Sequence, residues 1–151
     1  MDTVIDTSEL DLADLTVPGL LARAVERFGD AEAVVDLSVD PPVRLSFREL
    51  SNEARATAKA LIAAGVEPGD RVAIWAPNIW EWPVTLLGIH LAGGVLVPLN
   101  TRYKGSEAAF ILNRSRAKVL FTVQGFLGND YVSMLDDLEL PSIERIVILR
   151  G

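Results

Sequence analysis

The chain has 151 residues, 50% of them hydrophobic, and a formal net charge of −7 at pH 7. This length and apolar content are enough for about one domain with its own core. The acidic residues are spread along the chain, and such a surface repels the phosphates of nucleic acids and of anionic membranes. We therefore expect neither nucleic acid nor a membrane surface as a partner.

The composition also limits metal and thiol chemistry. The chain has no cysteines and one histidine, His90. Disulfides, thiolate metal sites and a cysteine nucleophile are therefore excluded, and a histidine cluster cannot form. We predict no metal site from these residues.

Two segments bear on location. Residues 1–15 are acidic and lack the basic and apolar regions of a signal peptide, so we expect a flexible leader on a cytoplasmic protein. The most apolar stretch, 83–99, is interrupted by Gly93, Gly94 and Pro98. Because a membrane span needs about 20 uninterrupted apolar residues, we expect no membrane span.

The first half of the chain predicts two helices with a β-hairpin between them. Thr16 can cap a helix over 16–28, which Gly29 ends. Strands at 31–36 and 43–45 flank a proline-containing turn. The capping box that begins at Ser46 starts the second helix, which ends at Gly65.

The second half alternates strands with helices. Strands are predicted at 71–75, 95–98, 119–123 and 143–149, and helices from Asn78 to the Gly93-Gly94 pair, at 107–116 and at 130–138, with a loop at 125–128. Alternation of this kind indicates a mostly parallel sheet with helices on both faces. The predicted fold class is α/β, and we expect the first three strands to be buried.

The residues alone assign no catalytic group. Phosphate-binding glycine loops and a nucleophile elbow are absent. His90 lies between apolar residues of a predicted helix and is interpreted as a core or interface histidine. The cluster of Trp75, Trp80 and Trp82 favours helix-to-sheet packing, with an aromatic wall of an acyl pocket as the alternative.

Three segments carry a family resemblance. Residues 45–75 (LSFRELSNEARATAKALIAAGVEPGDRVAIW), 91–100 (LAGGVLVPLN) and 100–121 (NTRYKGSEAAFILNRSRAKVLF) resemble, in order and spacing, the opening motifs of the adenylate-forming superfamily. That superfamily includes acyl-CoA synthetases and the adenylation domains of peptide synthetases. The stretches WAPNIWEW, IHLAGG and NTRY are most similar to actinobacterial acyl-CoA ligases, particularly those acting on propanoate side chains of sterol-ring catabolites.

The resemblance implies an ATP-dependent, AMP-forming acid–CoA ligase that uses ATP, Mg and CoA with a small carboxylic acid. The family's phosphate-binding loop, magnesium ligand, ribose-binding aspartate and catalytic lysine have no match among these 151 residues. We therefore expect 16–151 to be the N-terminal portion of an AMP-binding domain, truncated at its C-terminal end. The fragment alone is expected to be inactive and to bind none of these cofactors tightly.

Two alternatives stay open. The chain could be a short non-catalytic scaffold or partner module derived from that fold, or a fragment of a peptide-synthetase adenylation domain. Strands buried in a longer parent would be less covered in this chain. We therefore also expect self-association through exposed apolar surface.

Arg102 is the one site residue that the resemblance implies. In the NTRY segment it matches a position where some CoA ligases of the family hold an arginine near CoA phosphates. A solvated arginine on a loop is the alternative. The Lys104-Gly105 pair departs from the family's common Thr-Pro, and Ser106 is the expected helix cap instead.

We predict that the 151-residue chain, given ATP and a carboxylic acid, releases no pyrophosphate. A triphosphate is held and activated by backbone N–H groups and cations directed at its oxygens, and the sequence lacks the motifs that supply them. Calorimetric titration with ATP should show no saturable binding. Tight, saturable binding would contradict the prediction.

Overall fold

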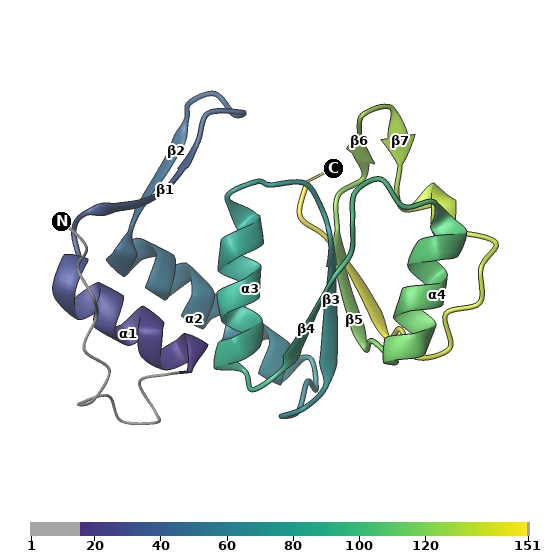
Figure 1. The fold of residues 1–151 in the computed structure, drawn as a ribbon, viewed down its shortest axis with the longest axis horizontal. Coiled ribbons are helices and arrows are strands. Elements are labelled where there is room, and N and C mark those ends of the chain that lie inside the picture. Colours follow the sequence, from purple (N-terminus) through teal and green to yellow (C-terminus); the bar gives the residue numbers. More distant parts are fainter. Residues whose placement is uncertain (1–15, 151) are drawn as a thin grey trace, which may run out of the picture.

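The computed structural model describes residues 16–150, and the predicted leader at 1–15 lies outside that range. A four-stranded sheet forms the centre, with a β-hairpin at each side of its upper edge (Figure 1). The elements are α1 (Val17–Phe28), β1 (Glu32–Asp36), β2 (Val43–Ser46), α2 (Phe47–Ala63), β3 (Arg71–Trp75), α3 (Glu81–Leu91), β4 (Val95–Pro98), α4 (Gly105–Ser115), β5 (Val119–Thr122), β6 (Gly125–Phe126), β7 (Asn129–Asp130), the 3-10 turn η2 (Ser133–Leu135) and β8 (Arg145–Ile148).

The central sheet is parallel, in the order β4-β3-β5-β8. Val72 of β3 pairs with Leu96 of β4 on one side and with Val119 of β5 on the other. The α3 crossover covers one face and the α4 crossover covers the opposite face; α2 packs beside α3 and contributes to the core, and α1 lies farther out (Figure 1). The predicted α/β class, with helices on both faces, is confirmed.

Local signals in the first half of the chain are confirmed. The Thr16 hydroxyl accepts a hydrogen bond from the Gly19 N–H at 3.1 Å. The backbone N–H of Ser46 donates to the Glu49 carboxylate at 2.8 Å, and the Ser46 hydroxyl accepts from the Glu49 N–H at 3.3 Å. These contacts satisfy N–H groups that a helix start leaves free. They fix where α1 and α2 begin.

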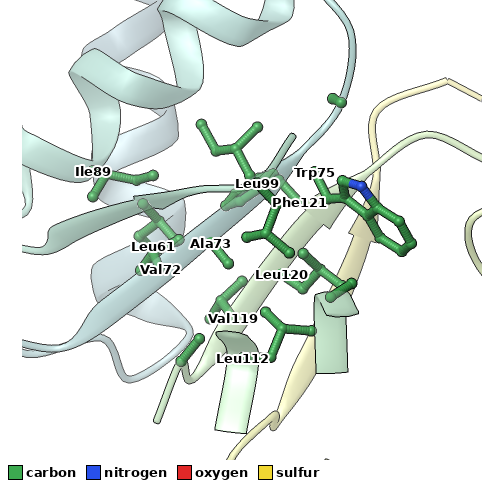
Figure 2. Packing of buried hydrophobic residues seen from close by; sticks show 14 of the residues in the cluster. Leu61, Val72, Ala73, Trp75, Ile89, Leu99, Leu112, Val119, Leu120 and Phe121 are labelled. Atoms are coloured by element: carbon green, nitrogen blue, oxygen red, sulfur yellow. The ribbon is translucent and has the colours of Figure 1, made fainter. Parts of the chain in front are cut away.

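The core lies on both faces of β3 and β5. Figure 2 shows Leu61 of α2 and Ile89 of α3 beside Val72, whereas Leu112 of α4 lies beside Leu120. All five side chains are 3% exposed or less. Burying a side chain of this size contributes about 1.5–3 kcal/mol, so this layer supplies much of the stability.

The start of α3 differs from the prediction. Asn78 does not cap the helix, which begins at Glu81, with Trp80 as the flanking residue and no side-chain cap. The Trp80 N–H instead donates to the Asp36 carboxylate at 3.1 Å. Pro83 then falls in the first turn, where its missing N–H has no partner to lose. A long-range contact therefore replaces the local cap that the sequence suggested.

The start of α4 also differs. The helix runs over Gly105–Ser115, so Ser106 lies inside it and the flanking residue is Lys104. The Lys104 N–H donates to the Glu107 carboxylate at 2.8 Å. A side chain at position 105 would collide with the carbonyl oxygen of Met134. Glycine is needed there because the η2 segment packs directly on the first turn of α4.

The predicted helix at 130–138 is wrong. Only the 3-10 turn η2 forms there, although the Asp130 carboxylate accepts from the N–H groups of Val132 and Ser133, as a cap would. Tyr131 and Leu135 are 1% and 5% exposed because both enter the core. Tertiary burial of these two side chains outweighs helix propagation. The predicted loop at 125–128 contains the small β6–β7 hairpin.

Burial of the strands follows their position in the sheet. The residues of β5 are all buried, and so are those of β3 after Arg71, as predicted. The β4 strand is an edge strand, and its Val95 is 47% exposed, which corrects the prediction of a buried strand. Within residues 16–150, no helix is long and apolar enough to cross a membrane.

We predict that the chain self-associates through the edge formed by β8. Ile146 and Ile148 of this edge strand are 41% and 46% exposed, and unpaired edge strands template further pairing. The double variant Ile146→Lys/Ile148→Lys should shift the chain toward monomer in size-exclusion chromatography with light scattering. Phe110→Lys is the matched control, because Phe110 is 70% exposed but lies on α4. A compact, stable wild-type monomer would contradict the prediction.

Candidate functional site

A crevice of about 530 Å³ opens at the carboxyl edge of the central sheet. Its lining comes from segments that follow β1, β3, β4, β5 and β8, namely Ser38, Pro77, Asn78, Ile79, Thr101, Val123, Gly125, Phe126 and Arg150. In the order β4-β3-β5-β8, the connection from β3 leads to β4 on one side, whereas the chain after β5 leads to β8 on the other side. The strand order therefore reverses direction between β3 and β5. Ligands of open α/β sheets bind at such switch points, outside the carboxyl ends of the strands.

The loop after β4 is anchored to this edge by two aromatic side chains. Trp75 Nε1 donates to the Asn100 carbonyl at 3.0 Å, and the Tyr131 hydroxyl donates to the Thr101 carbonyl at 2.7 Å. The two rings stack, with centroids 4.3 Å apart and planes 5° from parallel. Burial raises the pKa of the Tyr131 hydroxyl, so it remains a donor at neutral pH.

This anchoring also positions Arg102, which directly follows the crevice-lining Thr101. The Arg102 N–H donates to the Asn100 side chain at 2.9 Å, which fixes the backbone of the turn. The side chain is exposed. Within residues 16–150, the Arg102 guanidinium has no hydrogen bond or ion pair. Its charge is therefore available to an anion from outside the chain.

The second arginine of the site, Arg150, is fully occupied. Its Nε and one terminal nitrogen each lie 2.7 Å from the Glu81 carboxylate oxygens, and the same terminal nitrogen lies 2.7 Å from Asp36 Oδ2. The side chains of Arg150, Asp36 and Glu81 are 27%, 7% and 15% exposed. We call these three residues the Arg150 cluster.

Asp36 lies at the centre of the Arg150 cluster. Its carboxylate also accepts from the Ser38 N–H at 2.8 Å, from the Ser38 hydroxyl, and from the Trp80 N–H at 3.1 Å. The bonds from Ser38, followed by the bond from Arg150, hold the pKa of Asp36 well below its ordinary range. The hydrogen bonds that Arg150 donates to Glu81 and Asp36 raise the pKa of its guanidinium. Both groups are charged at neutral pH.

The charges decide what the crevice can bind. Two carboxylates against one guanidinium leave the Arg150 cluster with one net negative charge. This wall repels a phosphate, although it contains an arginine. No group of acidic or histidine residues that could hold a metal ion occurs in the described range. The residues present therefore do not fit the triphosphate of ATP or its Mg²⁺.

None of the remaining sequence candidates lines this crevice. Trp75 packs in the core, as interpreted, and Trp82 packs against it. Trp80 and Trp82 also line a neighbouring apolar groove beside the β1–β2 hairpin. His90 is half-buried on α3 and does not line the crevice.

The Arg150 cluster was not identified from the sequence. Asp36 and Arg150 each lie at or just beyond a predicted strand end, which is a usable signal for a site at a sheet edge. Their pairing is not visible in the sequence, because 114 positions separate them. The contact of Glu81 with Arg150 is not visible in the sequence either, because 69 positions separate the two residues.

The AMP-binding enzyme family matches residues 21–150. A 7a-methyl-1,5-dioxo-octahydro-1H-inden-4-yl propanoyl:CoA ligase of Mycobacterium tuberculosis is 46% identical over 87% of this chain and 25% of its own length. The ligase of the same name from Rhodococcus jostii is 43% identical over 90% of this chain and 26% of its own length. The match covers most of the chain, so this protein belongs to the AMP-binding enzyme family.

Solved structures agree with this assignment. The anthranilate CoA ligase AuaEII, in complex with anthranoyl-AMP, superposes with a TM-score of 0.80 at 27% identity, over 93% of this chain and 27% of that one. The N-terminal domain of FACL13 from M. tuberculosis gives 0.78 at 27% identity, over 89% and 34%. The chain spans about a quarter of the length of its curated relatives.

We predict that Asp36→Asn destabilises the chain by about 3 kcal/mol at neutral pH, because it leaves Arg150 partly unpaired in a buried site. An unfolded aspartate takes up a proton near pH 3.9, whereas folded Asp36 stays ionised to lower pH. The stabilisation is therefore present above about pH 4 and is lost as the pH falls further.

Urea denaturation of both proteins at several pH values measures this effect. Asp30→Asn is the control, because Asp30 pairs with Arg48 while 90% exposed, and should change stability by less than about 0.5 kcal/mol. A variant as stable as the wild type at pH 7 would contradict the prediction.

Proposed function

We propose that this chain is the amino-terminal section of an ATP-dependent, AMP-forming acid–CoA ligase. A carboxylate oxygen attacks the α-phosphorus of ATP, pyrophosphate leaves, and the acyl-adenylate forms. The thiol of CoA then attacks the acyl carbon and AMP leaves, which yields the thioester. The supporting observation is the 43–46% identity with two propanoyl:CoA ligases across almost the whole chain.

The acid is proposed to be a propanoate attached to a fused-ring system that carries oxo groups, as in the names of those two relatives. The proposed location is the cytoplasm, where ATP and CoA are available. Residues 16–151 are proposed to form the N-terminal portion of the AMP-binding domain. The groups that grip the triphosphate would come from outside this segment, since its own crevice wall carries a net negative charge.

We further propose that Arg102 contacts a phosphate of CoA. Its guanidinium is exposed, without a partner among the described residues, and held on a loop that Trp75 and Tyr131 fix. A guanidinium binds phosphate oxygens with two parallel hydrogen bonds, which suits this role. The contrast with the neutralised Arg150 favours Arg102 as the anion-binding arginine of this edge.

A peptide-synthetase origin has weaker support. The nonribosomal peptide synthetase FmoA3 superposes with a TM-score of 0.69 at 26% identity, over 90% of this chain. The CoA ligase AuaEII gives 0.80. The curated relatives with the higher identities are also named as CoA ligases.

The direct test uses a protein that carries this chain together with its genomic continuation to the length of the relatives. Acid-dependent exchange of pyrophosphate into ATP reports the first step, and thioester formation reports the second. Ring-bearing propanoates should support both steps. Exchange without thioester formation for any acid would contradict the ligase assignment and favour an adenylation domain.

We predict that Arg102→Ala in that protein raises the KM for CoA about 10-fold, since a hydrogen bond to a charged group contributes roughly 1.5–3 kcal/mol. Acid-dependent pyrophosphate exchange should be unchanged, because CoA takes no part in that step. Arg102→Lys should retain part of the affinity, and Arg44→Ala, on the β1–β2 hairpin, is the control. An unchanged KM for CoA in Arg102→Ala would refute the assigned contact.

A further inference from the structure

Arg150 connects the two walls of the crevice. Its side chain binds Asp36 at the end of β1 and Glu81 at the start of α3, and these hold the wall that contains Ser38 and Asn78. Its backbone carbonyl accepts from the Gln124 N–H at 2.9 Å. Gln124 links β5 to β6, so this bond holds the opposite wall.

Hydrogen bonds also connect Gln124 to the loop after β4. The Gln124 carbonyl accepts from the Tyr131 N–H at 3.0 Å, and the Tyr131 hydroxyl reaches the Thr101 carbonyl at 2.7 Å. The β6 residues Gly125 and Phe126 line the crevice directly after Gln124. A displacement of Arg150 would therefore reach both walls.

The chemistry of the Arg150 cluster favours a fixed geometry. A guanidinium fork binds a carboxylate in one plane through two parallel bonds, whereas an ammonium group tolerates many directions. Asp36 and Glu81 are too buried for water to replace the arginine without cost. The hairpin has few other attachments at this edge: in the described range, Asp36 receives its long-range bonds from Trp80 and Arg150 alone.

We propose that Arg150 is a positioning residue that sets the width of the carboxyl-edge crevice, and through it the affinity for the substrate group that lies there. The claim about width rests on this chain alone. The claim about affinity rests also on the proposed ligase function.

A second cluster supplies a matched control at the opposite edge of the same sheet. Lys118 Nζ donates to the Gly65 carbonyl at 2.7 Å and to Asp70 at 3.1 Å. Its side chain is 24% exposed, close to the 27% of Arg150. Lys118→Met therefore removes a comparable three-element contact without touching the crevice.

The width can be measured in the 151-residue chain, with no activity required. The chain has no cysteines, so spin labels can be placed by Leu37→Cys and Leu127→Cys alone. Both positions are 71% exposed and follow the two opposing walls. In Arg150→Met, pulsed electron–electron double resonance should give a longer and broader distribution of distances between the two labels. In Lys118→Met the distance distribution should match that of the doubly labelled chain without a further substitution.

Arg150→Lys keeps the charge but loses the fork, so it should give an intermediate distribution. If Arg150→Met fails to fold by circular dichroism, Arg150→Lys and Glu81→Gln carry the test. An unchanged distribution in the folded variants, or an equal change in Lys118→Met, would overturn the proposal.

In the complete ligase, Arg150→Lys should raise the KM for CoA or for the acid by roughly 10-fold while kcat changes less, because the crevice no longer holds its occupant in place. Lys118→Met should lower the melting temperature and leave both KM values unchanged. An inactive wild-type protein would defeat the proposed function but not the measured width. An active ligase whose KM values are unchanged in Arg150→Lys would defeat the affinity claim.

Discussion

Parallel pairing of β3 with both of its neighbours is the constraint from which the site follows. Because β4, β3, β5 and β8 all run the same way, their carboxyl ends meet at one edge. Each crossover must then return across a face of the sheet, which places α3 and α4 on opposite sides (Figure 1). The segments that leave the strands therefore converge around one crevice, although up to 112 positions separate them in the sequence.

The two arginines of this edge differ in whether their charge is paired within the described residues. Arg150 is ion-paired with two carboxylates and stabilises the structure of the crevice. The Arg102 guanidinium has no partner among residues 16–150, while its backbone is fixed by Asn100 and its loop by Trp75 and Tyr131. Because the backbone is already fixed, binding of an external anion would need to order only the side chain.

Elements whose signals are local could be predicted from the sequence. The capping box at Ser46 and the buried apolar run of β3 each predict their own structure, and the structure agrees. The predictions that were wrong depended on distant residues. Asn78 does not cap α3, and the Trp80 N–H at the start of that helix binds Asp36 instead. The helix expected after Asp130 does not form, because the Tyr131 ring stacks on Trp75 in the core.

The same limit applies to the site. The NTRY segment identified Arg102 through a family resemblance, but only the folded chain shows that its charge has no partner in the described range. The Arg150 cluster joins three segments through side chains, and no periodicity or spacing records such a contact. The exposed edge position of β4 was likewise set by strand order, which the residues of the strand do not encode.

The most direct test of the carboxyl edge as the ligand-binding side is an NMR titration of the isotopically labelled 151-residue chain with millimolar CoA. We expect weak, fast-exchange shifts concentrated at the backbone amides of Thr101, Arg102 and Gly125. Shifts concentrated around Asp70 and Lys118 at the opposite edge, or no shifts at all, would contradict it.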